Sequence, residues 1–205
     1  MPLQTPNKRR PNVNTEQTPI TKQKLKAILG FGAIIDFIII DQLSKWYILE
    51  HVMRPKWDFG AQPLGIFEWF SSSERIGVAS TDITSFFSLT MVWNHGISFG
   101  LFQNDTPYAL IGLAILISCI FSAWLWKATG WTQAIALAMV IGGAIGNVID
   151  RLHFGAVADF LDFHINGWHY PAFNMADSFI TIGIAILLFD SVFLEPKRNT
   201  VKTKN

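Results

Sequence analysis

Four long apolar blocks restrict the fold of this 205-residue chain more than any other feature. A helix needs about 20 apolar residues to cross the ~30 Å hydrocarbon layer of a membrane, because each residue adds about 1.5 Å. Hydrophobic residues make up 50% of the chain, too many for an ordinary soluble domain when they occur in unbroken blocks. The sequence therefore predicts an all-α membrane protein with four transmembrane helices, at about residues 27–49, 107–126, 128–149 and 178–194.

The charges are strongly partitioned along the chain. Residues 1–26 carry a net charge of +5 and residues 195–205 carry +3, whereas the part between them carries −7. Lys and Arg collect on the cytoplasmic side of membrane proteins. We therefore expect a disordered basic tail at 1–26, a four-span domain at 27–194 and a second tail at 195–205, with both tails in the cytoplasm.

The segment at 50–106 lies between the first two predicted spans and is mixed in character. Proline and glycine interrupt any long helix in its first part, where acids outnumber bases. Residues 86–103 contain no Lys, Arg, Asp or Glu, but a fifth span would place the basic C-terminal tail outside, and the alternation around residues 88–93 is strand-like. We expect a small β-rich subdomain outside the membrane, in which 86–103 form a strand, a turn at Asn94-His95-Gly96 and a re-entrant strand.

Four aspartates stand in the stretch from Gly142 to Asp177, which connects the last two spans. An acid at the centre of a spanning helix costs roughly 2.5 to 3.5 kcal/mol, so acids here are expected to face a partner or a wet cavity. The predicted topology brings Asp150, Asp159, Asp162 and Asp177 to the same outer membrane surface. Spacing alone leaves open whether Asp159 or Asp162 faces Asp177.

Paired carboxylates favour one chemistry in particular. Two such groups cannot both ionise at low cost, so one keeps a proton while the other acts as a base, which is the arrangement needed to activate water and protonate an amide. The histidines lack H-E-x-x-H spacing, and no G-x-S-x-G motif occurs. We therefore predict an aspartic-type hydrolytic site without metal, with substrate-positioning donors at Asn94, Asn147, Arg151 and Asn174.

Charged residues in or beside the spans leave two other functions open. Asp41 and Lys45 are four residues apart on one face of the first span, where an ion pair is expected. Together with Asp36 and Asp150 they also suit a small proton-coupled transporter, although four unlike spans lack the internal repeats of such proteins. A binding or assembly protein without catalysis is the third interpretation.

Five short motifs follow one another along residues 30–194. They are Asp41-Gln42-Leu43-Ser44-Lys45, Asn94-x-Gly96-x-x-Phe99-Gly100, Gly142-Gly143-x-x-Gly146-Asn147-x-x-Asp150-Arg151, Val157-x-Asp159-Phe160 and Pro171-Ala172-Phe173-Asn174-x-Ala176-Asp177. In type and order they resemble the lipoprotein signal peptidase (signal peptidase II) family. The resemblance implies a multi-pass endopeptidase of the bacterial inner membrane, with both termini cytoplasmic and its active site and β-rich subdomain at the periplasmic face.

The resemblance also implies a substrate and a set of roles. The substrates would be diacylglyceryl-modified prolipoproteins in contact with membrane lipid, cleaved just before the lipidated cysteine by a monomer that uses no cofactor or nucleic acid. Asp159 and Asp177 occupy the family's catalytic positions, whereas Asp162 does not. Positions lining the family's site match Asn94, Asn147, Arg151 and Asn174, and structural support is expected from Asp41, Lys45, Gly96, Asp150 and Ala176.

Two departures from the family's pattern stand close to this site. His95 and Ile97 replace residues that are often small in the family, and the loop between Lys45 and Asn94 is longer than usual. We therefore expect substrate entry to differ while the chemistry is retained.

Overall fold

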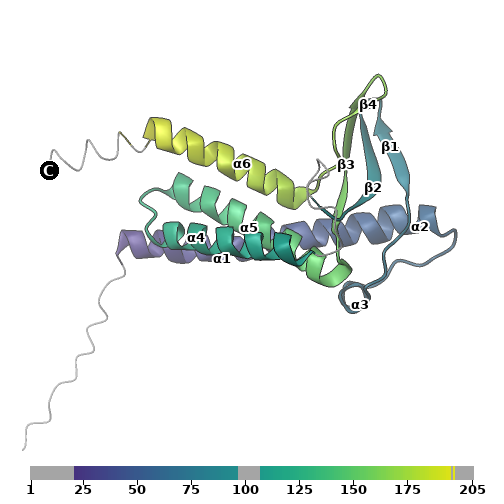
Figure 1. Ribbon diagram of the computed structural model, residues 1–205, viewed down its shortest axis with the longest axis horizontal. Helices are drawn as coiled ribbons and strands as arrows, with labels where there is room; N and C mark the ends of the chain where they lie inside the picture. Colours follow the sequence, from purple (N-terminus) through teal and green to yellow (C-terminus); the bar gives the residue numbers. More distant parts are fainter. Residues whose placement is uncertain (1–20, 97–106, 195, 197–205) are drawn as a thin grey trace, which may run out of the picture.

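The computed structural model describes residues 21–96, 107–194 and 196. Its long helices run side by side, and a four-stranded sheet stands across one end of them (Figure 1). Within the described ranges, four helices are long and apolar enough to cross a membrane, at Lys22–Trp57, Tyr108–Trp126, Trp131–Phe154 and Met175–Leu194. The prediction of an all-α membrane protein with four spanning helices and a small β-rich part is confirmed.

The first spanning helix is longer than the expected block at 27–49. Helix α1 covers Lys22–Tyr47 and continues through a π-helical segment, Ile48–Met53, into α2, Arg54–Trp57. The side chain of Thr21 caps its start by accepting a hydrogen bond from the backbone N–H of Lys24. Residues 22–26 were expected to belong to the disordered tail. They lie after the cap and form the start of the helix instead.

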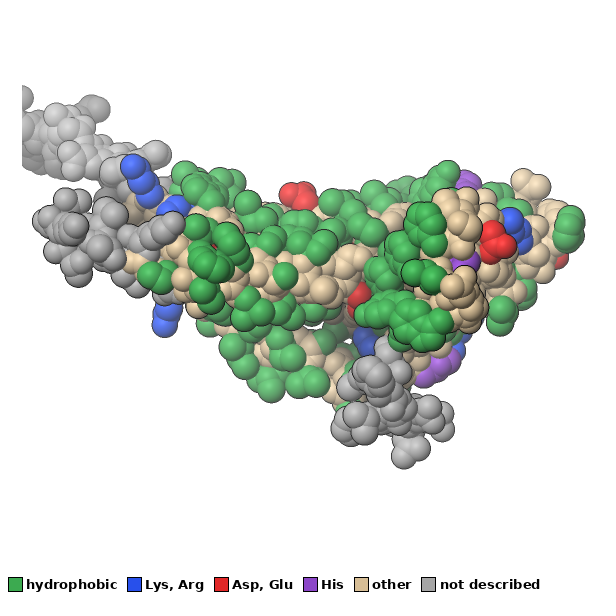
Figure 2. All heavy atoms as spheres, turned by 90° about the horizontal axis from the view of Figure 1, so that it is seen from above, with side chains coloured by type: hydrophobic (Ala, Val, Ile, Leu, Met, Phe, Trp, Pro, Cys, Tyr) green, Lys and Arg blue, Asp and Glu red, His purple; other side chains and the backbone are tan. Residues whose placement is uncertain are grey.

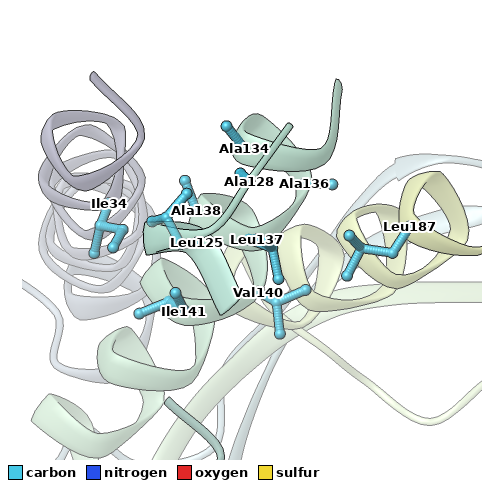
Figure 3. Packing of buried hydrophobic residues seen from close by; sticks show 10 residues of the cluster. All are labelled: Ile34, Leu125, Ala128, Ala134, Ala136, Leu137, Ala138, Val140, Ile141 and Leu187. Carbon is cyan, nitrogen blue, oxygen red and sulfur yellow. The ribbon is translucent and has the colours of Figure 1, made fainter. Parts of the chain in front are cut away.

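Helix α5, Trp131–Phe154, is the most buried of the four and contacts α1, α4 and α6. Helix α4 covers Tyr108–Trp126, and α6 covers Met175–Phe189 with a π-helical end at Asp190–Leu194. Alanines and branched aliphatic side chains fill the contacts in Figure 3. A Cβ on Gly142 of α5 would lie 2.7 Å from Cβ of Phe37 on α1, so glycine permits this close crossing.

Helix α4 ends at Trp126, where the second span was expected to end, whereas α5 begins later than expected. The third span was expected to begin at 128, but α5 begins at Trp131, because Gly130 has extended backbone angles and forms the N-cap. The backbone N–H of Thr129 donates to Gln133 Oε1 at 2.9 Å, and its carbonyl accepts from Lys26 Nζ at 2.6 Å. These bonds use backbone groups that the turn leaves without helical partners.

The sheet is antiparallel, with strand order β1-β2-β3-β4. The strands are β1 Ser80–Thr84, β2 Phe87–Asn94, β3 Val157–Ile165 and β4 Trp168–His169. Strand β3 follows α5 almost directly, and its start pairs with the end of β2 as Val157 with Asn94 and Asp159 with Val92. The expected strand before the Asn94 turn is present, whereas the expected re-entrant strand lies outside the described residues.

A second hydrophobic cluster fixes the sheet on the end of the helices. It contains Leu49, Met53, Trp69, Ile76, Ala79, Leu89, Met91, Phe154, Ala158 and Phe160. Trp69 belongs to a short helix, α3, Ile66–Ser71. Glu50 and Arg54 form an ion pair at 2.5 Å, and Glu50 Oε2 also accepts the backbone N–H of Leu64 at 2.9 Å. The sheet therefore has a core of its own, which it shares with the π-helical segment of the first spanning helix and with the end of α5.

The surface of the helical body is mostly hydrophobic. Figure 2 shows hydrophobic side chains along its length and Lys and Arg side chains at the end where α1 begins. Helix α1 begins and α6 ends at that same end, opposite the sheet (Figure 1). Asp36, for which the sequence gives no partner, is exposed on α1, and its carboxylate has no partner in the part of the chain that the structure describes.

Candidate active site

Asp159 and Asp177 lie where α5, β3 and the start of α6 meet, at the end of the bundle that carries the sheet. Asp159 is on β3 and is 2% exposed, and Asp177 is half-buried in the first turn of α6. Asn174 caps that helix, since its Oδ1 accepts the N–H of Asp177 at 3.0 Å while Asp177 Oδ2 accepts the N–H of Asn174 at 3.2 Å. The cap fixes the Asp177 side chain in place.

Side-chain amides link the two carboxylates. Asn174 Nδ2 donates to Asp159 Oδ1 at 2.7 Å, and Asn147 Nδ2 donates to Asp177 Oδ1 at 2.8 Å. The two amides are themselves connected, because Asn174 Nδ2 also lies 3.2 Å from Asn147 Oδ1. Asn94 Nδ2, at the end of β2, donates to the other oxygen of Asp159 at 3.0 Å. Three asparagines from three elements thus hold the pair in one network.

The pKa of Asp159 is raised from 3.8 to about 7, mainly by burial and secondly by the negative charge of Asp177. The hydrogen bonds from Asn94 and Asn174 oppose this, because they stabilise the carboxylate. Near neutral pH the protonated and ionised forms of Asp159 are therefore both accessible. A carboxyl group of this kind can give up a proton to a substrate, which an ordinary surface aspartate cannot do at that pH.

Arg151 brings hydrogen-bond donors to the same place. It is half-buried near the end of α5, where its Nη1 donates to the carbonyl of Asn147 at 3.3 Å. Its Nε is buried and has no hydrogen-bond partner among the described residues. The charges of Asp177 and Asp159 both act on the guanidinium. Arg151 therefore offers a cation with unused donors beside the carboxylates.

Behind the site lies a buried ion cluster. Lys45 Nζ is 2.7 Å from Asp41 Oδ2 and 2.8 Å from Asp150 Oδ2, and all three side chains are fully buried. The expected Asp41–Lys45 pair thus has a second acid as partner. Lys45 Nζ also lies 3.3 Å from Asn147 Oδ1, which joins the cluster to the network of asparagines. Gly146 leaves room for it, because a Cβ there would overlap the carboxylate of Asp41.

The ion cluster also holds the backbone beside each of the two aspartates. Asp41 Oδ1 accepts the N–H of Ala176 at 2.9 Å, and Asp150 Oδ2 accepts the N–H of Ala158 at 3.1 Å. These two residues immediately precede Asp177 and Asp159 in the sequence. Gln42, which no chemical pattern singled out, donates to Asp150 Oδ1 at 2.9 Å.

Asp162 has different neighbours. Three positions along a strand separate it from Asp159, so the two side chains point to opposite faces of β3. Asp162 Oδ1 lies 2.8 Å from Nδ1 of His169 on β4. His164 bonds instead to Ser88 Oγ at 2.9 Å, and His153 packs among aromatic rings, with Trp69 5.7 Å away between ring centroids. In the described residues no group of three or more His, Cys, Asp or Glu side chains is placed to hold a metal ion.

The remaining predicted site residue, Gly96, lies at the turn after β2. Its N–H donates to Asn94 Oδ1 at 3.0 Å, which orients the amide that reaches Asp159. His95, between them, contacts Arg75 from the long loop, a residue that sequence reasoning did not single out. No signal in the sequence marks Arg75, because its partners lie far away along the chain.

The fold and the site together define a protein with four candidate membrane spans and a buried carboxylate network at one end of its helical bundle. A family model described as signal peptidase (SPase) II matches residues 33–193. The chain belongs to the signal peptidase II family, a family of proteases, and the resemblance seen in its motifs is confirmed.

Relatives and solved structures agree with this membership. A lipoprotein signal peptidase of Burkholderia ambifaria is 39% identical over 172 residues, which are 80% of this chain and 86% of that protein. One from Rhizorhabdus wittichii is 37% identical over 174 residues, 82% of this chain and 89% of that protein. A solved bacterial membrane enzyme is 25% identical with a TM-score of 0.57, covering 82% of this chain and 91% of that one. A second, 24% identical with a TM-score of 0.59, shares the fold.

Proposed function

We propose that this protein is an aspartic endopeptidase that removes the signal peptide from diacylglyceryl-modified prolipoproteins by cleaving before the lipidated cysteine. One observation supports the aspartic mechanism above all. The carboxylates of Asp159 and Asp177 are joined through Asn174 and Asn147 at the end of a membrane-spanning bundle. The family supplies the substrate class.

In the proposed reaction Asp159 is the acid and Asp177 is the base. Asp159 has a raised pKa of about 7 and so can hold a proton near neutral pH, which leaves the part of the base to Asp177. Water attacks the scissile carbonyl carbon as Asp177 takes a proton from it, and Asp159 gives its proton to the carbonyl oxygen. Collapse then breaks the C–N bond as the proton on Asp177 passes to the leaving amine nitrogen and a hydroxyl of the intermediate returns a proton to Asp159, which restores both carboxyl groups. No covalent bond to the protein forms.

The neighbouring donors would position the substrate. Arg151 has a buried Nε without a partner in the described part of the chain, and it can polarise or hold a backbone carbonyl beside the pair. Asn94, Asn147 and Asn174 already bond to the aspartates, so their part is to hold the carboxylates. The transporter alternative is less well supported, because Asp41 and Asp150 are both tied to Lys45.

The charge distribution supports a topology with both termini in the cytoplasm and the site at the periplasmic face of the inner membrane. Lys22, Lys24 and Lys26 lie in the first turns of α1, and the sheet and the aspartates lie at the other end of the bundle. Basic residues favour the cytoplasmic side. In this orientation the site is at the membrane surface, where the lipid chains on the substrate's cysteine would lie in the bilayer. We propose that a single copy of the chain carries out the cleavage.

The first prediction is cleavage itself. The purified protein in detergent or liposomes should release the signal peptide from a diacylglyceryl-modified prolipoprotein, and mass spectrometry should find the modified cysteine at the new N-terminus. The matched control is the same precursor without the lipid, which should remain uncut. A chelator of divalent metal should leave the rate unchanged, because the proposed water activation needs only carboxylates. Cleavage at another bond, or equal cleavage of both precursors, would contradict the proposal.

A second prediction concerns pH. Asp159 holds its proton below its raised pKa of about 7 and loses it above. Because the proposed acid must be protonated, kcat should fall on the alkaline side, by about tenfold for each pH unit well above that pKa. Initial rates at saturating substrate between pH 6 and pH 9 (about one unit apart or less) test this. A rate that stays constant or rises across this range would rule out Asp159 as the acid.

A further inference from the structure

Arg75 connects the long extra-membrane loop to two elements of the site. It lies between α3 and β1, and its Nε and Nη2 both donate to the carbonyl of Phe154, with Nε at 2.6 Å. Its Nη1 donates to His95 Nε2 at 2.8 Å. The guanidinium also lies over the ring of Trp93, 5.6 Å from the ring centroid. One side chain thus bridges the end of α5 and the end of β2.

The end of α5 is shaped to receive this guanidinium. Phe154 is the last residue of the helix, so its carbonyl has no partner within the helix. Gly155 follows with a φ of 73°, and a Cβ there would come within 2.7 Å of Arg75 Nη2. Glycine therefore both permits the left-handed cap and leaves space for the arginine. A planar guanidinium suits this place, because it can donate to two acceptors at once.

The contact is fixed on the other side as well. Trp93 Nε1 donates to the carbonyl of Ile76 at 2.8 Å, so the loop and the end of β2 are joined at consecutive positions. Ile76 itself is buried in the second hydrophobic cluster. The Arg75 side chain is exposed to solvent, but the backbone beside it is held by the hydrogen bond from Trp93 to Ile76. Arg75 therefore connects α5 and the end of β2 from a loop whose backbone is itself held in place.

His95 connects Arg75 to the turn that carries Asn94, the residue whose amide bonds to Asp159. It is the residue after Asn94, whose amide donates to Asp159 Oδ2, and the residue before Gly96, whose N–H orients that amide. Because arginine can only donate, His95 must accept through a neutral Nε2. Displacing His95 would move the turn that holds the Asn94 amide. Of the residues described, Arg75 is the one side chain that bonds to His95.

We propose that Arg75 is a positioning residue for the peptidase reaction: its bridge from the Phe154 carbonyl to His95 holds Asn94 against Asp159. The inference rests on the proposed function, since it needs a cleavage rate to act on. It also assigns a role to the two departures from the family's pattern, because the longer loop supplies Arg75 and the turn supplies His95. Arg75 itself touches neither carboxylate.

The pH profile separates this role from a purely structural one. The hydrogen bond from Asn94 lowers the pKa of Asp159, so releasing Asn94 should raise that pKa. Since activity needs protonated Asp159, the alkaline limb of the kcat profile should move to higher pH. In Asn94→Ala a shift of about one unit is expected from a lost hydrogen bond to a charged group. A merely destabilised protein would lose active molecules without moving the limb.

The experiment compares variants in the lipidated-precursor assay. Arg75→Met should lower kcat by about three- to tenfold, less than the ~10²-fold cost of a 1 Å misplacement, and should move the alkaline limb upward by about half a unit. Lys56→Met removes another exposed cation of the same region and should change neither quantity. His95→Leu should behave like Arg75→Met, whereas His95→Gln, whose amide oxygen can accept in place of Nε2, should keep most of the activity.

A double variant supplies the decisive comparison. If Arg75 acts through Asn94, Arg75→Met in an Asn94→Ala background should cost little more than Asn94→Ala alone. Multiplied losses, an unmoved alkaline limb in Arg75→Met, or equal activity of the Leu and Gln variants of His95 would each overturn the proposal. Thermal unfolding of every variant in detergent identifies losses caused by misfolding. Absence of cleavage by the unmodified protein would instead contradict the proposed function.

Discussion

Asp159→Asn and Asp177→Asn should each reduce cleavage of a lipidated prolipoprotein by about 10³-fold or more, because each removes one half of an acid–base pair. Asparagine retains the size and much of the hydrogen bonding of aspartate but neither accepts nor donates the catalytic proton. The rate losses caused by replacing residues that act as a unit do not multiply, so the double variant should be about as active as the less active of the two single variants. Single-turnover release of the signal peptide measures all three.

Asp162→Asn is the matched control for this experiment. Asp162 is also a buried acid on the same strand, but it contacts His169 and points to the other face of β3. Its variant should cleave within about threefold of the unmodified protein, as expected for a residue outside the network. Loss of activity in Asp162→Asn with retention in Asp159→Asn would exchange their roles and refute the proposed pair.

Thermal unfolding at high pH tests whether Asp159→Asn is folded. The folded-state pKa of Asp159 is raised from 3.8 to about 7, so the folded protein binds this proton more tightly than the unfolded chain. Its contribution to stability therefore falls as the pH rises through that window and is lost above it. Asparagine has no proton to lose in this range, so the variant avoids the cost of burying an ionised carboxylate. At pH 8 (about one unit above the pKa) the variant should unfold at a temperature at least as high as the unmodified protein.

The apolar blocks were sufficient to predict four spans, because length and hydrophobicity are local properties that crossing a membrane requires. Their ends were less predictable. The first spanning helix continues through its π-helical segment beyond the expected end at residue 49, since Glu50 and Arg54 pair along it. That continuation depends on contacts with Leu64 and Glu74, which follow much later in the chain.

The site shows the same division. The motif around Asn174 and Asp177 carries its own geometry, because a capping residue and an acid three positions later bond to each other. The contact of Asp150 with Lys45 depends instead on how α1 and α5 cross at Gly146, and that of Arg75 with Phe154 spans 79 residues. The residue types in the sequence indicated which groups could react. The contacts that hold those groups in place, such as those of Lys45 and Arg75, depend on how the helices and the loop pack.

Lys45→Met should be the most destabilising single change in the bundle. It leaves the carboxylates of Asp41 and Asp150 buried together without their shared cation, and breaking such a group by removing one partner costs about 3–5 kcal/mol. We expect little folded protein, or a strongly lowered unfolding temperature in detergent. Lys26→Met is the control on the same helix, because its one hydrogen bond, to the Thr129 carbonyl, is exposed and worth about 1 kcal/mol.

A compensated variant separates charge from packing. Asn at 41 and 150 retains an oxygen for the N–H groups of Ala176 and Ala158, so Lys45→Met combined with Asp41→Asn and Asp150→Asn should recover most of the lost unfolding temperature. Failure to recover would show that Lys45 contributes through shape rather than charge. Cleavage should stay below that of the unmodified protein even after recovery, since Asn147 Oδ1 loses one of the two donors that orient its amide toward Asp177. The buried cluster would then serve both the fold and the geometry of the pair.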